Sequence, residues 1–131
     1  MVVGLGIDLV DVARIKKAID NDRFTQRVFT PTERQYCDKR GQGAAQSYAA
    51  RFAGKEAVIK AFGTGLRGGA LTDVEITNDE LGAPQVKLMG HWAELAKQKN
   101  VTKIHLSLTH LADYAAAECI LENLEAERVI G

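Results

Sequence analysis

The chain has 131 residues, of which 46% are hydrophobic and 26% are charged, and its 17 basic side chains balance 17 acidic ones. These values are typical of one globular domain, which we expect to span residues 1–131. The balanced charge gives no indication of a nucleic-acid or membrane partner, so electrostatic recognition would depend on local patches.

Residues 2–10 alternate between large and small side chains, which predicts a strand. The even positions hold Gly4, Gly6 and Asp8, and the odd positions hold four bulky apolar residues: Val3, Leu5, Ile7 and Leu9. Because a strand sends alternate side chains to opposite faces, we expect the odd face to pack in the core. The even face would leave space for a ligand or another backbone to approach. Asp8 is then a site carboxylate, the end of the strand or a helix N-cap.

Two short helices are predicted next. The first, over residues 11–20, is amphipathic and exposes three cations: Arg14, Lys16 and Lys17. These cations form either a solvated face or a patch that receives an acidic partner. In the second, Thr30 is the expected N-cap, with Pro31 at the first helical position and Glu33 completing a capping box.

A longer helix is predicted over residues 44–62, closed by Gly63, and it is apolar on nearly all sides. It nevertheless carries Glu56 and Lys60, which share a face because they are four residues apart. A buried charge needs a partner or a metal, so we expect both residues on a buried face where they take part in chemistry. The alternative is an ordinary ion pair on a partly exposed face. Residues 63–69 are rich in glycine but follow a helix C-terminus, where the dipole repels anions, so they do not form a P-loop.

The remaining chain predicts two hairpins separated by a helix, with strands at 74–77 and 85–88, a helix at 90–99, and strands at 104–109 and 114–121. Helices and antiparallel strands that cluster rather than alternate favour an α+β fold, with antiparallel strands packed on the long buried helix. His110 lies at the mouth of the last turn, as either a functional side chain or a hydrogen-bonded structural residue. Residues 122–131 form a charged tail.

The two cysteines, Cys37 and Cys119, have neither metal-ligand spacing nor a disulfide pattern. The first residues contain no basic segment, and the apolar run there is too short to cross a bilayer. We therefore expect a reduced, cytoplasmic protein with no membrane partner.

Asp8, Glu56, Lys60 and His110 form a candidate site if the fold brings them together. Two carboxylates without a cluster of cysteines or histidines suit Mg²⁺, which is held by one or two carboxylates together with waters and phosphate oxygens. A nearby lysine neutralises charge on a phosphate group. These residue types predict Mg²⁺-assisted transfer of a phosphorus-containing group.

Several segments together resemble the bacterial holo-acyl-carrier-protein synthases, the small single-domain branch of the 4′-phosphopantetheinyl transferases. They are Gly4-Leu-Gly-Ile-Asp8-Leu-Val, Arg51-Phe-Ala-Gly-Lys-Glu56-Ala, Lys60-Ala-Phe-Gly-Thr64, Gly82-Ala-Pro84 and His105-Leu-Ser107-Leu-Thr-His110. The resemblance covers essentially residues 1–121. Gly54, Leu106 and Leu108 depart from the usual pattern, and we expect Gly54 to permit close packing of the helix.

The resemblance implies transfer of phosphopantetheine from coenzyme A to a serine of apo acyl carrier protein, with release of adenosine 3′,5′-bisphosphate. Asp8 and Glu56 match the magnesium ligands of the family. Lys60 matches a lysine near the coenzyme A phosphates, where it would protonate or stabilise the leaving phosphate. A base must activate the serine, and it is Glu56, Asp8 or a metal-bound water.

The resemblance also assigns the binding surfaces. His110 matches a histidine that lines the coenzyme A site, and Gly63 and Thr64 fall in the loop that borders it. Arg14 matches a basic residue of the first helix, on which the acidic carrier protein docks. Family members are homotrimers with each active site between neighbouring subunits. The alternatives are a non-catalytic module that binds coenzyme A or a carrier protein, and an oligomeric structural protein.

Overall fold

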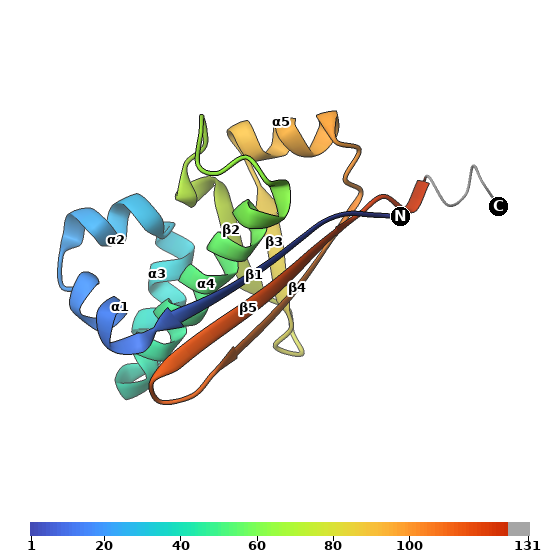
Figure 1. Ribbon diagram of the computed structural model, residues 1–131. Coiled ribbons are helices and arrows are strands. Elements are labelled where there is room, and N and C mark those ends of the chain that lie inside the picture. The colour runs from blue at the N-terminus through green and yellow to red at the C-terminus, as the bar shows by residue number, and fades with distance from the viewer. Residues whose placement is uncertain (126–131) are drawn as a thin grey trace.

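The computed structural model describes residues 1–125, so residues 126–131 of the predicted tail lie outside the described part (Figure 1). Its helices, strands and 3₁₀ turns (η) are β1 (Val2–Asp11), α1 (Val12–Ala18), α2 (Asp22–Val28), α3 (Pro31–Asp38), η1 (Gly41–Gly43), α4 (Ala44–Phe62), η2 (Leu71–Asp73), β2 (Val74–Asn78), β3 (Pro84–Leu88), α5 (Gly90–Gln98), β4 (Lys103–His110) and β5 (Tyr114–Glu122). The predicted order of elements is confirmed, with the addition of α2.

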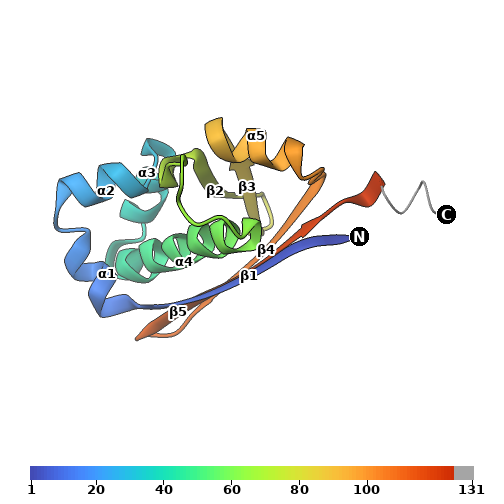
Figure 2. The same cartoon turned by 45° about the horizontal axis from the view of Figure 1, so that its top comes forward.

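The strands form two antiparallel sheets. One has the order β1-β5-β4, and the other is the β2–β3 hairpin. Helix α4 lies between the three-stranded sheet and a second layer that contains α2, α3, α5 and the hairpin (Figure 2). The predicted α+β fold, with antiparallel strands packed on a long buried helix, is confirmed. None of the helices among residues 1–125 is long and apolar enough to cross a membrane.

Glycines in β1 let the strand lie directly against the backbone of α4. A Cβ atom at Gly4 would lie 2.0 Å from the carbonyl oxygen of Ala61, and one at Gly6 would lie 1.9 Å from that of Ala57. No side chain fits at either position, so the predicted close approach of another backbone at these glycines is confirmed. It aims the even positions of β1, including Asp8, at α4.

The prediction that the odd face of β1 packs in the core is wrong. Leu5, Ile7 and Leu9 are 62%, 66% and 68% exposed, because the even face packs on α4 and no described residue covers the other side. Across the sheet, Leu5 pairs with Ile120 and Leu9 with Ala116, so the outer face of the three-stranded sheet carries further apolar side chains. A stripe of large apolar residues is typical of a core strand, and here it marks an uncovered surface.

Helix α4 has 19 residues and is buried on both sides. It ends as predicted at Gly63, which has the left-handed φ of 76° that glycine adopts without strain. At Gly54 a Cβ would lie 2.6 Å from Ile76 Cδ1 and 3.0 Å from Leu108 Cδ2. The absent side chain therefore brings the helix close to both sheets, as the sequence predicts.

The capping residues show which local signals the sequence analysis used and which it missed. The capping box of Thr30 and Glu33 is present. Helix α2 was not predicted, although Asn21 caps it by accepting from the Arg23 and Phe24 amides at 2.9 Å and 3.4 Å. Asp11, and not Asp8, caps α1, accepting from Ala13 N at 2.9 Å. The strand also continues past Asp8 to Asp11, so neither structural role predicted for Asp8 applies.

Both cysteines, Cys37 and Cys119, are free and buried. Burial is the largest influence on each, and it raises the pKa of both thiols, that of Cys119 to about 12. Neither thiol is therefore a reactive thiolate near neutral pH.

Candidate active site

Asp8, Glu56, Lys60 and Arg14 line one cavity of about 360 Å³, which we call the acidic cavity. Asp8 comes from β1, Arg14 from α1, and the other two from α4. The rest of the wall is largely apolar and includes Ile15, Phe24 and Phe52. The fold therefore brings together the two carboxylates, the lysine and the arginine that the sequence analysis selected.

Lys60 joins α4 to β1 through Asp8. Its Nζ donates to Asp8 Oδ1 at 2.8 Å and to the carbonyl oxygen of Ile7 at 3.2 Å. The hydrogen bond to Asp8 raises the pKa of the Lys60 ammonium. The side chain of Lys60 is 53% exposed and that of Asp8 is 13% exposed. The prediction of a fully buried charged face is thus wrong for Lys60, because this side of α4 opens to the cavity.

Glu56 is half-buried beside the Asp8 carboxylate. Burial is the largest influence and raises the pKa of Glu56, Asp8 raises it further, and Lys60 opposes the shift. Two carboxylates that repel each other at one cavity are a suitable pair for a cation. No group of three or more His, Cys, Asp or Glu ligands occurs among residues 1–125. This donor set fits Mg²⁺, which needs only one or two protein carboxylates when a phosphate and water complete its shell.

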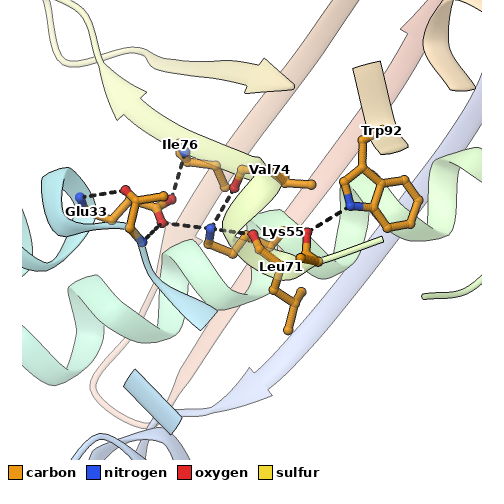
Figure 3. A network of polar contacts seen from close by, with 8 residues as sticks. Glu33, Lys55, Leu71, Val74, Ile76 and Trp92 are labelled. Carbon is orange, nitrogen blue, oxygen red and sulfur yellow. Dashed lines mark hydrogen bonds and ion pairs between the residues drawn. The ribbon is translucent and has the colours of Figure 1, made fainter. Parts of the chain in front are cut away.

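The fully buried charged pair is a different one, formed by Lys55 of α4 and Glu33 of α3, in a network that the sequence analysis missed (Figure 3). Lys55 and Glu33 are both 0% exposed and pair at 2.7 Å. Lys55 Nζ also donates to the carbonyl oxygens of Leu71 at 2.9 Å and Val74 at 2.6 Å. Burial is the largest influence on the pKa of Lys55 and lowers it, and Glu33 opposes that shift. The capping box predicted Glu33 as a helix residue, but no sequence pattern shows that it meets Lys55.

His110 lines a second cavity, of about 650 Å³, which we call the basic cavity. Lys39, Arg40 and Arg51 also line it, and none of them was among the predicted site residues. Arg51 is 3% exposed, donates to Asn78 Oδ1, and has its guanidinium 4.0 Å from the centroid of the Tyr36 ring. Arg51 is the first residue of the motif that contains Glu56, and this position was the one signal in the sequence that could have selected it as a site residue.

Within one chain, the predicted site residues therefore do not all lie at the same cavity. His110 does not share a cavity with Asp8, and Gly63 and Thr64 line neither cavity. The two loop residues directly follow α4, three and four positions after Lys60. Thr64 Oγ1 is 3.2 Å from the carbonyl oxygen of Gly65, to which it donates.

Comparisons with known proteins identify the family. Residues 4–119 match the 4′-phosphopantetheinyl transferase superfamily. The chain is 44% identical over 125 residues to the holo-acyl-carrier-protein synthase of Trichlorobacter lovleyi, covering 93% of this chain and 98% of that protein. It is 48% identical over 122 residues to that of Desulforudis audaxviator, covering 92% of each.

Solved structures agree with the sequence matches. The crystal structure of the Neisseria meningitidis holo-acyl-carrier-protein synthase superposes with a TM-score of 0.85 at 29% identity, covering 94% of this chain and 100% of that chain. The Bacillus anthracis synthase in complex with CoA (3′,5′-ADP) gives a TM-score of 0.79 at 34% identity, covering 94% and 98%. These matches support an enzyme rather than the binding-module or structural alternatives.

Proposed function

The chain belongs to the 4′-phosphopantetheinyl transferase superfamily and, within it, to the holo-acyl-carrier-protein synthases, and we propose that the acidic cavity is its transfer site. The enzyme transfers phosphopantetheine from coenzyme A to acyl carrier protein. The observation that carries the proposed site is the meeting of Asp8, Glu56 and Lys60 at one cavity.

Asp8 and Glu56 are the proposed ligands of a magnesium ion. The proposal is supported by the repulsion between the two carboxylates, which contributes to the raised pKa of Glu56. Bound there, Mg²⁺ would polarise the phosphorus that is attacked and neutralise charge on the pyrophosphate. Both carboxylates must be ionised to hold the ion, so its affinity falls as the pH falls.

Lys60 is the proposed partner of the coenzyme A phosphates. An ammonium has three donors, of which Asp8 and the Ile7 carbonyl take two, so one donor is left for a phosphate oxygen. The half-exposed side chain can reach a ligand in the cavity, where its charge stabilises the leaving phosphate. The base that activates the serine hydroxyl is Glu56, Asp8 or a metal-bound water, all of which lie at the proposed metal site.

The basic cavity is the proposed site for the nucleotide part of coenzyme A, contributed by a neighbouring subunit. Its three cations, Lys39, Arg40 and Arg51, suit a phosphate-bearing ligand, and His110 lies among them. Within one chain the basic cavity and the acidic cavity are separate. A complete site therefore needs two copies of the chain, as in the homotrimer that the resemblance implies.

The proposed trimer interface is the outer face of the three-stranded sheet. Leu5, Ile7 and Leu9 are exposed there side by side, and monomeric proteins rarely leave such an apolar patch uncovered. Light scattering on the purified protein tests the proposal. The trimer mass is expected for the wild type and a smaller mass for Ile7→Lys, whereas a monomeric wild type contradicts it.

Arg14 is the proposed docking residue for the carrier protein. It lines the acidic cavity from α1, two and three residues before the exposed Lys16 and Lys17. Cations placed there would steer an acidic protein so that its serine enters the acidic cavity.

Intact mass of a carrier protein tests the magnesium proposal most simply. The protein, coenzyme A, MgCl₂ and an apo acyl carrier protein are combined with and without EDTA, and with an excess of Mg²⁺ restored after EDTA. We expect a gain of one phosphopantetheine that is lost with EDTA and returns with Mg²⁺. A gain that persists in EDTA contradicts the metal site, and no gain with several carriers despite coenzyme A binding supports the binding-module alternative.

A further inference from the structure

Residues 63–70, which we call the glycine-rich loop, leave α4 at Phe62 and return to the fold at Leu71. Gly63, Gly65 and Gly68 have positive φ values of 76°, 67° and 77°. A loop with so many unrestricted residues has many conformations to lose on binding a ligand. Contacts that fix the ends of the loop therefore reduce the conformational entropy that is still to be lost when a ligand binds.

Trp92 of α5 contacts both ends of this loop. Its ring stacks on Phe62 with a centroid distance of 5.9 Å and an interplanar angle of 30°. Its Nε1 donates to the carbonyl oxygen of Ala70 at 2.9 Å, and Figure 3 shows this bond as a dashed line from the indole nitrogen. The side chain is 0% exposed. One buried indole thus joins the residue before the loop to the last residue within it.

The last glycines of the loop lie directly on α5. A Cβ at Gly69 would lie 2.3 Å from Trp92 Cζ2, and one at Gly68 would lie 3.3 Å from His91 Cε1. Beyond the loop, Lys55 Nζ donates to the Leu71 carbonyl at 2.9 Å. Two consecutive carbonyl groups, of Ala70 and Leu71, are therefore held by the side chains of Trp92 and Lys55.

We propose that Trp92 is a positioning residue for coenzyme A, because it fixes both ends of the glycine-rich loop. The inference rests on the proposed function and on the resemblance, which implies that the loop containing Gly63 and Thr64 borders the coenzyme A site. Trp92 is fully buried and lines neither the acidic cavity nor the basic cavity. Its role is to present the loop already ordered, so its removal weakens coenzyme A binding while the transfer chemistry continues.

Trp92→Phe is the test, because it keeps an aromatic ring next to Phe62 and removes the donor to Ala70, together with the part of the indole that packs on Gly69. The matched control is Tyr48→Phe, which removes another buried aromatic donor in the first half of α4. Tyr48 is 3% exposed and its hydroxyl donates to Asp38 Oδ1 at 2.7 Å. The control lowers stability through a similar lost hydrogen bond without touching the loop.

For Trp92→Phe we expect the KM and Kd for coenzyme A to rise about three- to tenfold, as for one lost hydrogen bond. The kcat and the KM for carrier protein should stay within about twofold of wild type. Amide hydrogen exchange should become faster in residues 63–70 of this variant and stay unchanged there in Tyr48→Phe. Unchanged coenzyme A binding and loop exchange in Trp92→Phe, at a melting temperature lowered as in the control, overturn the proposal.

A loop variant separates this inference from the proposed site. Gly65→Val has open space for its side chain but strains the backbone at φ 67°, so it disturbs only the loop conformation. If Gly65→Val weakens coenzyme A binding and Trp92→Phe does not, the positioning role is wrong and the placement of coenzyme A stands. If Gly65→Val leaves coenzyme A binding unchanged, the loop does not border the coenzyme A site.

Discussion

Two lysines of α4 each pair with one carboxylate, but in very different surroundings. Lys55 pairs with Glu33 at 2.7 Å, and both side chains are 0% exposed. Lys60 pairs with Asp8 at 2.8 Å, with 53% and 13% of the side chains exposed. The distances are almost equal, so the geometry of the pair alone does not separate the two.

The number of partners separates them. All three donors of Lys55 are used, by Glu33 and by the carbonyl oxygens of Leu71 and Val74. Glu33 is also fully engaged, since Oε1 accepts from Thr30 N at 2.9 Å and Oε2 from Ile76 N at 2.8 Å. A closed network of this kind joins α3, α4 and β2, and it has no capacity left for a ligand. The open pair at Lys60 has that capacity, which supports the proposal that it belongs to the transfer site.

The largest expected effect is on stability. Lys55→Met should lower the free energy of unfolding by about 3–5 kcal/mol, because it leaves the Glu33 charge buried without its partner. Chemical denaturation measures the loss. Adding Glu33→Gln should recover part of it, since the amide still accepts from Ile76 N and carries no charge. A loss below about 1 kcal/mol would mean that the network does not hold the fold.

Lys60→Met, the same substitution on the same helix, should reverse the pattern. We expect the free energy of unfolding to fall by no more than about 1 kcal/mol, because the pair with Asp8 is partly exposed. The kcat should fall about 10²- to 10³-fold, as for a group that stabilises charge in the transition state. If the stability losses of the two variants are equal, the contrast between the pairs is wrong.

Arg14→Glu should have a smaller and more selective effect. We expect the KM for carrier protein to rise about tenfold or more, because an acidic partner then meets a like charge, while coenzyme A binding stays nearly unchanged. Lys97→Glu on α5 is the matched control, an exposed helical cation away from the acidic cavity. Equal losses for both substrates refute the docking role.

The smallest expected effect is the pH dependence of stability. The folded-state pKa of Glu56 is raised, so ionisation of this carboxyl is harder in the folded than in the unfolded protein. Its contribution to stability therefore falls as the pH rises from the ordinary glutamate range through the raised pKa. Melting temperatures of the wild type and Glu56→Gln, measured in EDTA and plotted against pH, should diverge in that window. The wild type should lose stability relative to the variant as the pH rises. Parallel curves contradict the raised pKa.

Local patterns in the sequence predicted most of the elements of this fold. Period-two alternation indicated β1, the Thr30 box indicated α3, and Gly63 indicated the end of α4. Helix α2 was not predicted, although the Asn21-Asp22 start was a usable signal.

Burial could not be predicted in the same way, because it depends on which face another element covers. The bulky side of β1 was assigned to the core, but Gly4 and Gly6 turn the other side toward α4. Likewise, the fully buried charge on α4 is Lys55 and not Lys60, since its partner Glu33 comes from a different helix. Asp8, Glu56 and Lys60 do line one cavity, but Lys60 is half-exposed there and not buried as predicted.

The most direct test of the account measures both stability and turnover of Glu56→Gln. The substitution keeps the size of the side chain, removes a repelling charge beside Asp8 and removes a proposed magnesium ligand. We predict an unfolding free energy equal to or above that of the wild type without Mg²⁺, together with a fall in turnover of at least about 100-fold. Raised stability with full turnover would contradict the account, because Glu56 would then be a structural charge and the transfer site would lie elsewhere.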